Sequence, residues 1–166
     1  MEECIRTYEQ AFGTDEKDFT DALFKTCFKY CKVLKENNEI CSMLFLLPAT
    51  LKIGERQIDA EYLFAAATNE KYRGKGCMSR LIDSVKGNEP IFLKPANEGL
   101  VSFYERLGFK CVKATKARNK ELCLILEKEF YSLSKGTEYK NEEYTLMYYS
   151  KEELILNAIS FPFTME

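Results

Sequence analysis

The sequence predicts one domain of the mixed α/β class, with a central, mostly antiparallel sheet flanked by helices. Three observations carry this prediction. Apolar residues recur every three or four positions in residues 4–36, extended apolar segments follow one another in residues 41–68, and strand-like and helix-like segments then alternate to residue 109. The length of 166 residues is near the usual size of one domain, and no linker or repeat divides it, so we assign residues 1–166 to a single domain.

The composition is that of a soluble globular protein. Hydrophobic residues make up 46% and charged residues 30% of the chain, and no apolar run approaches the ~20 residues that span a bilayer. The N-terminus carries acidic residues early and lacks the pattern of a secretory signal. We therefore expect a cytoplasmic protein with no membrane partner.

Positive charge is concentrated in two places, although the net charge is −2. Residues 70–80 carry four basic side chains against one acid, and residues 110–120 carry five basic side chains with few aromatic neighbours. The net charge gives no reason to expect nucleic acid as a partner. The second cluster favours a solvated hairpin over a nucleic-acid site, for which steep salt dependence would be the mark.

The cysteines favour reduced thiols over disulfides. They are odd in number and spread through apolar segments, at Cys4, Cys27, Cys31, Cys41, Cys77, Cys111 and Cys123. Zinc sites need paired cysteine or histidine spacings, yet the chain has no histidine, and its closest cysteine pair is four residues apart on a predicted helix. We therefore expect no metal site.

The N-terminal part predicts two helices followed by strands. Residues 4–12 form an amphipathic pattern that ends at Gly13, and residues 20–36 carry an aromatic stripe at helical spacing. Residues 41–68 then predict an antiparallel meander of three strands. These strands cover residues 41–48, 49–53 and 57–68, with a hairpin turn at residues 54–56.

The second half predicts a strand–helix–strand arrangement. Residues 90–95 read as a short strand, and Asn97 is placed to cap a helix over residues 100–107. The crossover should be right-handed, with its two strands parallel. Residues 109–115 and 121–127 predict a hairpin around a basic loop.

The C-terminal segment predicts one more helix and an apolar end. Ser150 could cap a helix, with Glu153 completing a capping box. Residues 159–166 are too apolar for a free tail. They would pack under the domain or pair with a second subunit in a homodimer.

Two glycines bracket one residue directly before a helix expected over residues 78–85, in the string KYRGKGCMSRLI. Gly74 and Gly76 let the backbone approach a ligand closely, and the free amides and dipole of the helix start favour an anion. The alternative is an ordinary helix start with solvated basic residues. The glycine spacings of a P-loop and of a dinucleotide-binding fingerprint are absent.

The setting of this turn resembles the paired motifs of the GNAT superfamily of N-acetyltransferases. EYLFAAATNEKYRGKGCMSRLI is similar to the first motif, a strand followed by R/Q-x-x-G-x-G/A and a helix, whose marked positions fall on Arg73, Gly76 and Met78. Met78 departs from the glycine or alanine of the family, although its amide is still available. NEGLVSFYERLGF resembles the second motif, which is matched at Asn97, Phe103, Tyr104, Gly108 and Phe109.

The resemblance implies a layered fold in which the fourth and fifth strands, a parallel pair, splay apart and admit the pantetheine arm of acetyl-CoA. Pantetheine would then pair with the fourth strand, here residues 62–68, as an added strand does. The small side chains of this strand fit that role and fit tight helix packing equally well. The cofactor contacts implied are Ala66, Ala67, Thr68, Arg73, Gly74, Lys75, Gly76, Cys77, Met78 and Asn97.

The same resemblance implies two catalytic residues. A lysine-like amine with pKa ~10.4 must lose a proton to react, at about 4.6 kcal/mol at pH 7, so a base is useful. Glu61 is the candidate, beside the C-terminal carboxylate or a relayed water. Tyr104 would protonate the leaving thiolate, and the amide near Ala66 would stabilise the oxyanion. On spacing alone, however, Glu61 could be a solvated strand end and Tyr104 a core aromatic.

These implications define the expected function. The chain would transfer the acetyl group of acetyl-CoA to a primary amine of a small molecule or peptide, by direct attack through a tetrahedral intermediate. The alternative is a catalytically weak acyl-CoA-binding sensor or docking module. The sequence does not identify the acceptor amine.

Overall fold

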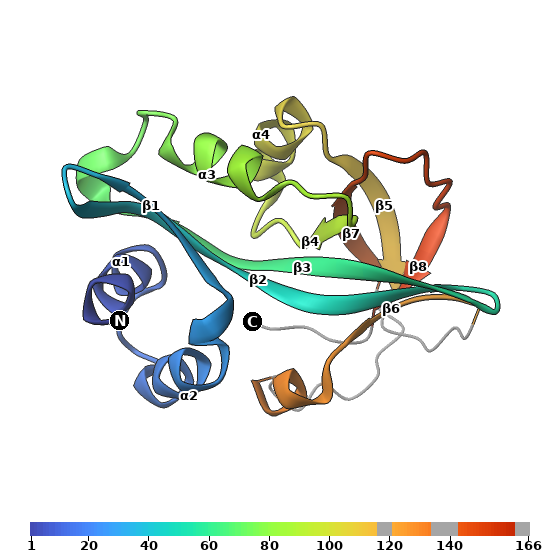
Figure 1. Cartoon of the computed structure of the whole chain (residues 1–166), viewed down its shortest axis with the longest axis horizontal. Coiled ribbons are helices and arrows are strands. Elements are labelled where there is room, and N and C mark those ends of the chain that lie inside the picture. Colours follow the sequence, from blue (N-terminus) through green and yellow to red (C-terminus); the bar gives the residue numbers. More distant parts are fainter. Residues whose placement is uncertain (116–120, 134–142, 162–166) are drawn as a thin grey trace. The chain divides into compact units, whose positions relative to one another are not determined.

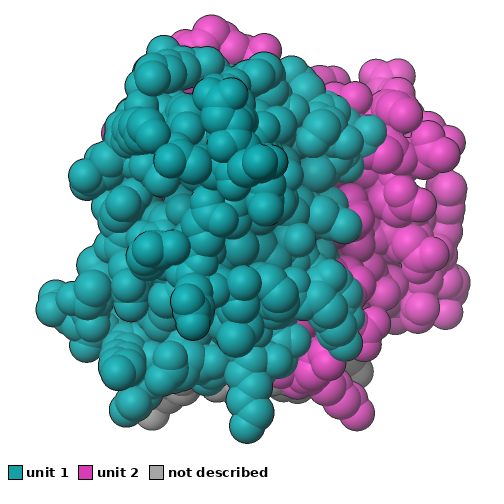
Figure 2. All heavy atoms as spheres, turned by 60° about the vertical axis from the view of Figure 1, so that its left-hand side comes forward, with its two compact units in different colours: residues 1–47, 63–86 teal, residues 48–62, 87–166 magenta. Residues whose placement is uncertain are grey.

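The structure is a computed structural model that describes residues 1–115, 121–133 and 143–161 (Figure 1). It contains two compact units: unit 1 holds residues 1–47 and 63–86, and unit 2 holds residues 48–62 and 87–166 (Figure 2). Two long strands, β2 (Glu39–Ile53) and β3 (Arg56–Thr68), run through both units. The assignment of residues 1–166 to one domain stays a prediction.

The predicted mixed α/β class is confirmed. The hydrogen-bonded strand order is β1-β2-β3-β4-β7-β5-β8-β6, with both antiparallel and parallel neighbours. In unit 1, Figure 1 shows α1 and α2 on one side of β1 and β2, and α3 on the other. The expected layering of helices on both sides of a sheet is therefore present in this unit.

The first helix agrees with its prediction, and the second is shorter than predicted. Helix α1 (Glu2–Phe12) ends at Gly13, whose φ of 85° is the left-handed conformation that glycine adopts readily. Helix α2 (Lys17–Cys27) is followed by a 3₁₀ turn, η1 (Phe28–Tyr30), and by strand β1 (Cys31–Glu36). The prediction of one helix over residues 20–36 was therefore wrong in its second half.

A two-residue turn explains this difference. Asn37 and Asn38 have φ values of 51° and 65°, which is the pattern of a hairpin turn whose twist matches the flanking strands. The turn pairs Glu36 with Glu39 and sets β1 antiparallel to β2. Strand pairing therefore overrides a helical spacing of apolar residues that was too short to be decisive.

The strands that follow are longer than predicted. Residues 41–48 and 49–53 form the single strand β2, and β3 begins at Arg56. After β3 come a 3₁₀ turn, η2 (Glu70–Tyr72), and helix α3 (Cys77–Val85), which agrees with the predicted helix.

Unit 2 is built from short elements. They are β4 (Ile91–Leu93), η3 (Glu98–Leu100), α4 (Val101–Arg106), β5 (Lys110–Thr115), β6 (Leu122–Leu126), η4 (Lys128–Leu133), β7 (Glu143–Tyr149) and β8 (Ala158–Ser160). Strand β4 pairs in parallel with β3, with Ile91 opposite Glu61 and Phe92 opposite Tyr62. The predicted parallel pair is therefore confirmed.

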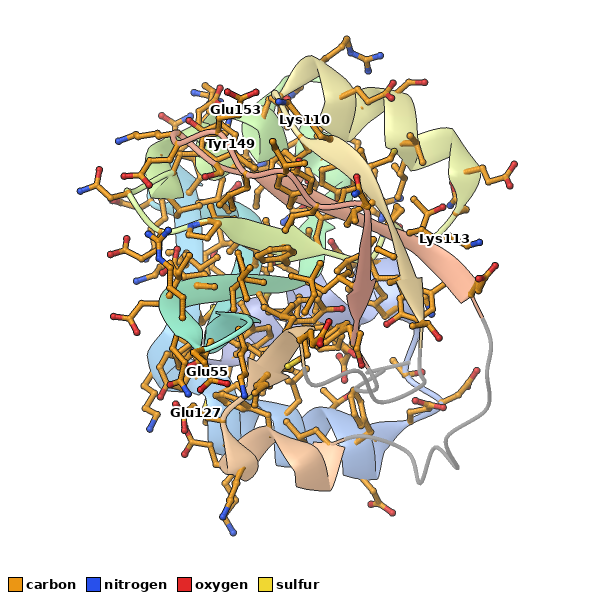
Figure 3. The ribbon with its side chains drawn as sticks, turned by 90° about the vertical axis from the view of Figure 1, so that its right-hand side faces the viewer. Glu55, Lys110, Lys113, Glu127, Tyr149 and Glu153 are labelled. Atoms are coloured by element: carbon orange, nitrogen blue, oxygen red, sulfur yellow. The ribbon has the colours of Figure 1, made fainter. Side chains whose placement is uncertain are left out.

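The predicted hairpin of residues 109–115 and 121–127 was wrong. Strand β5 pairs with β7 and β8, and β6 pairs with β8 and with the second half of β2. Strand β8 therefore lies between the two segments that were expected to pair. The basic loop at residues 116–120 lies outside the described residues, while Lys110 and Lys113 lie on β5 (Figure 3), and Lys113 Nζ is 2.6 Å from Glu143 Oε2.

The helix predicted from Ser150 does not form. Residues 150–157 are irregular, and the hydroxyl of Tyr148 donates a hydrogen bond to the carbonyl of Leu154 at 3.0 Å. The chain then enters β8, and the ring of Phe161 lies 5.0 Å from that of Tyr62. The apolar end through residue 161 therefore packs within unit 2, whereas residues 162–166 lie outside the described part of the chain.

Two further observations bear on the expectations from composition. All seven cysteines are free in the structure, and the reduced state of their thiols stays a prediction. Among the described residues, no helix is long and apolar enough to cross a membrane.

Phe24 anchors helix α2 and provides a test of the packing in unit 1. Its ring is 2% exposed and meets the rings of Phe45 and Tyr8 edge-on, at centroid distances of 5.3 and 5.8 Å. We predict that Phe24→Ala lowers the free energy of unfolding by about 3–5 kcal/mol, measured by chemical denaturation. Phe28→Ala, at a site that is 38% exposed, is the matched control and should cost less than about 1 kcal/mol. Equal losses would contradict this packing.

Candidate cofactor-binding site

The turn between β3 and α3, in unit 1, leaves several backbone amides without a backbone partner. Gly74 and Gly76 have φ values of 73° and 72°, and an added Cβ at either would meet nothing within 4 Å. The need for glycine is therefore conformational and not a matter of space. Within the described residues, the amides of Gly74, Gly76, Cys77 and Met78 donate no hydrogen bond to a backbone carbonyl. Amides without backbone partners at the positive end of a helix dipole are suited to binding an anion, and the binding role of this turn stays a prediction.

Side-chain hydrogen bonds brace this turn. The guanidinium of Arg73 donates from Nη2 to the carbonyl of Gln10 at 3.0 Å and from Nε to the carbonyl of Thr68 at 3.3 Å. Asn69 Oδ1 accepts from the amide of Lys71 at 3.1 Å, and the amide of Asn69 donates to the carbonyl of Cys41 at 3.0 Å. Arg73, which the motif places among the cofactor contacts, therefore holds the turn in place.

The charges around the turn are unequally neutralised. Lys71 Nζ lies 2.6 Å from a carboxylate oxygen of Glu39, and Arg80 is paired with Glu36. Arg73 is 3.7 Å from Glu70.

Lys75 is different. Its ammonium group lies 5.3 Å from the centre of the Tyr72 ring, and no carboxylate of the described residues forms an ion pair with it. Lys75 is therefore the exposed cation that is left to meet an anionic ligand at this turn.

Strand β3 is distorted just before the turn. Ala65 has a φ of 51°, a conformation that costs an alanine about 1–2 kcal/mol. Ala67 is 1% exposed, Ala66 is half-buried, and the hydroxyl of Thr68 shares a hydrogen bond of 3.0 Å with that of Ser42. Small side chains thus serve packing at Ala67, whereas the strain at Ala65 has no packing explanation and is typical of functional sites.

Tyr104, on helix α4 in unit 2, is a buried phenol. It is 7% exposed, and its ring meets those of Phe103 and Phe109 at 5.1 and 5.7 Å. Burial raises its pKa to about 12, because an apolar surrounding disfavours the phenolate. Tyr104 is therefore a neutral proton donor at physiological pH.

A second buried phenol, that of Tyr62, has no signal in the sequence. Its side chain is 2% exposed on β3. Burial raises the pKa of Tyr62, a backbone hydrogen bond at Lys94 opposes this shift, and the neighbouring Tyr104 adds to it. Tyr62 and Tyr104 are thus close enough to interact electrostatically. A large aromatic residue on a strand is indistinguishable from a core residue in sequence, so no pattern could have identified this pair.

Two predicted site residues occupy positions that differ from expectation. Glu61 lies within β3 and not at its start, and its amide donates to the carbonyl of Pro90 at 2.9 Å. Asn97 is exposed and precedes η3, but its side chain makes no capping hydrogen bond. Asn97 therefore occupies the predicted N-cap position without the side-chain hydrogen bond, and the roles of both residues at a ligand stay predictions.

Comparison with known proteins identifies the family. The family model described as "Acetyltransferase (GNAT) domain" matches residues 1–112. The chain therefore belongs to the GNAT family of acetyltransferases, which confirms the resemblance drawn from its two motifs. No curated protein matches the chain.

Solved structures share the fold at low sequence identity. A Corynebacterium glutamicum protein described as "histone acetyltransferase HPA2 and related acetyltransferase" is 18% identical, with a TM-score of 0.57 over 92% of this chain and 91% of that one. GCN5-related N-acetyltransferases from Kribbella flavida and Anabaena variabilis are each 18% identical, with TM-scores of 0.54 and 0.56 over 66% and 69% of this chain. The present chain spans only 31% and 32% of their lengths.

Proposed function

We propose that the chain is an N-acetyltransferase that binds acetyl-CoA and transfers its acetyl group to a primary amine of a small molecule or peptide. The observation that carries this proposal is the turn of residues 73–78. It combines two left-handed glycines, amides without backbone acceptors and the ammonium group of Lys75. These are the donors that the pyrophosphate of coenzyme A requires.

Strand β3 would hold the pantetheine arm. The strand continues to Thr68, beyond Tyr62, the last residue that pairs with β4. Backbone groups of residues 66–68 can pair with the amides of pantetheine as an added strand would. The left-handed conformation of Ala65 redirects the backbone directly before Ala66, whose amide we assign as donor to the oxyanion.

The chemistry follows in two steps. The acceptor amine attacks the thioester carbonyl carbon, and its proton passes to Glu61 or to a water relayed through a carboxylate. The tetrahedral intermediate then collapses, the carbon–sulfur bond breaks, and the phenol of Tyr104 gives its proton to the departing thiolate. Burial raises the pKa of Tyr104 to about 12. In a site without water the pKa of the leaving thiol would rise as well, which offsets the difference between the pKa values of the phenol and the thiol.

Several expectations remain predictions beside this proposal. They are the cytoplasmic location, the absence of a nucleic-acid partner and the homodimer. The sensor or docking alternative differs from the proposal in one respect, because it binds acetyl-CoA without releasing coenzyme A.

Lys75 provides a test of the cofactor turn. We predict that Lys75→Gln weakens acetyl-CoA binding about fivefold, equivalent to about 1 kcal/mol for one exposed charge pair, as measured by calorimetry at low salt. Lys71→Gln is the matched control, since Lys71 is already paired with Glu39, and should change affinity less than twofold, or by under about 0.4 kcal/mol. Equal losses in both variants would show that Lys75 only contributes to a diffuse positive field.

Tyr104 provides the test of turnover. Free-thiol release from acetyl-CoA, measured across a panel of amines, should show activity with at least one acceptor. We predict that Tyr104→Phe then lowers kcat by about 10²-fold or more with little change in acetyl-CoA affinity, because only proton donation is lost.

Tyr148→Phe is the control for loss of a buried hydroxyl, because this group bonds Leu154 in unit 2. It should lower stability and leave kcat unchanged. Binding without thiol release under every amine would instead support the sensor alternative, and an unchanged kcat in Tyr104→Phe would remove Tyr104 from the acid role.

A further inference from the structure

Two cysteine thiols and one carboxylate converge in unit 1. Glu36 ends β1, Cys41 lies on β2, and Cys77 is the first residue of α3. One carboxylate oxygen and the two sulfur atoms all lie within 4.8 Å of one another. Cys41 and Cys77 are 0% and 1% exposed, whereas Glu36 is only half-buried. Three potential metal ligands from three separate elements therefore meet at a site with one side toward solvent.

An apolar wall and one guanidinium group surround this cluster. Leu34 and Tyr72 pack against the two thiols and form an apolar wall. The guanidinium of Arg80 donates from Nη2 both to the Glu36 carboxylate and to Cys77 Sγ, the latter at 3.4 Å. Outer hydrogen-bond donors of this kind orient metal ligands and are part of natural metal sites.

Charge balance favours a divalent ion. With both thiols protonated, Glu36 and Arg80 cancel each other. With both thiols ionised and a divalent cation bound, three negative charges face one guanidinium and two positive charges on the metal, so the sum is zero again. Neither state leaves a net charge in this partly buried cluster, which would be costly.

We propose that Glu36, Cys41 and Cys77 bind one Zn²⁺ ion, with water as the fourth ligand on the exposed side. Thiolate and carboxylate ligands suit zinc, and three protein ligands leave an open position. Ligand atoms around a tetrahedral zinc lie about 3.4–3.8 Å apart, given bonds of ~2.1–2.3 Å, so closure from 4.8 Å or less needs only shifts of about 1 Å. Each thiol releases its proton to water on binding, and no oxidant is involved.

The ion would fasten the start of α3 to the β1–β2 hairpin. Cys77 directly follows Gly76, so zinc would fix the backbone of the turn whose amides lack backbone partners. The inference does not depend on acyl transfer, because it rests on ligands and their surroundings alone. The expectation of no metal site came from the sequence spacing, in which Cys41 and Cys77 are too far apart to suggest a pair.

Metal binding by the reduced full chain tests this proposal. Zn²⁺ is titrated in competition with a chromophoric chelator, and Co²⁺ is used as a spectroscopic probe. We expect one Zn²⁺ per chain, a thiolate-to-cobalt charge-transfer absorption, and a rise in Tm with Zn²⁺. Cys41→Ser, Cys77→Ser and Glu36→Gln should each weaken Zn²⁺ binding at least about tenfold. Cys111→Ser is the matched control, since Cys111 is exposed and distant in sequence from the cluster, and should bind as the unmodified chain does.

Each outcome of the metal titration either supports or overturns the zinc proposal. Absence of Zn²⁺ uptake or of the charge-transfer absorption in the unmodified, reduced chain would overturn the proposal. So would a loss in Cys111→Ser equal to that in Cys77→Ser, because binding would then be adventitious. If the cysteine variants fail to fold, Glu36→Gln and the cobalt spectrum of the unmodified chain decide the question. Acetyl-CoA binding can be intact whatever the zinc result, so failure here is distinct from failure of the proposed function.

Discussion

The backbone amides at the start of α3 are the constraint around which unit 1 is organised. A helix cannot satisfy its own first amides, so they need water, a cap or a ligand. Here the capping position is Gly76, which has no side chain to serve as a cap. Gly74 and Gly76 have positive φ values, and an added Cβ at either would meet no atom within 4 Å. The result is an array of donors without backbone partners, to which we assign the binding of a phosphate group.

The surrounding residues make this array rigid and moderately positive. Arg73 fastens it to the end of α1 and to the end of β3, and Asn69 fastens it to β2. Lys71 and Arg80 form ion pairs with acidic residues of the β1–β2 hairpin. They therefore hold the turn in place more than they add positive electrostatic potential to it. Lys75 therefore differs from Lys71, Arg73 and Arg80 in having no ion pair among the described residues, a difference that the sequence does not show.

Unit 2 imposes a different physical condition on its tyrosines. The segment that ends at Phe161 packs against Tyr62, and the hydroxyl of Tyr144 donates to the Phe161 carbonyl. Burial raises the pKa values of Tyr62, Tyr104 and Tyr144 together, so these phenols stay protonated well above neutral pH. An apolar surrounding that keeps the Tyr104 phenol protonated also makes it a weaker acid, so the acid role of Tyr104 stays a prediction.

Local patterns predicted the local features of the structure, and long-range pairing decided the rest. Helix α3 and its glycine turn were predicted because a strand, two glycines and a helical face follow one another directly in the chain. Residues 31–36 were misassigned because six residues fit both the helical spacing and the strand spacing of apolar positions. Only the Asn37–Asn38 turn and the pairing with β2 identify the segment as a strand. Strand β8, which comes from a distant part of the chain, pairs with both β5 and β6 and separates them. The helix predicted from Ser150 is absent because the segment before β8 is irregular. Three features of the site were also hidden in the sequence, because each depends on residues that are far apart in the chain. They are the lack of an ion pair at Lys75 among the described residues, the proximity of Tyr62 and Tyr104, and the cluster of Cys41 and Cys77.

The central claim is that the turn of residues 73–78 binds a phosphate of the cofactor. Calorimetry with S-acetyl-pantetheine and with its 4′-phosphate tests this directly, because the two ligands differ only in the phosphate. The account predicts that the phosphorylated ligand binds at least about tenfold more tightly, equivalent to one or more charge-assisted hydrogen bonds, and that the difference shrinks at high salt. Equal affinities for the two ligands would contradict it.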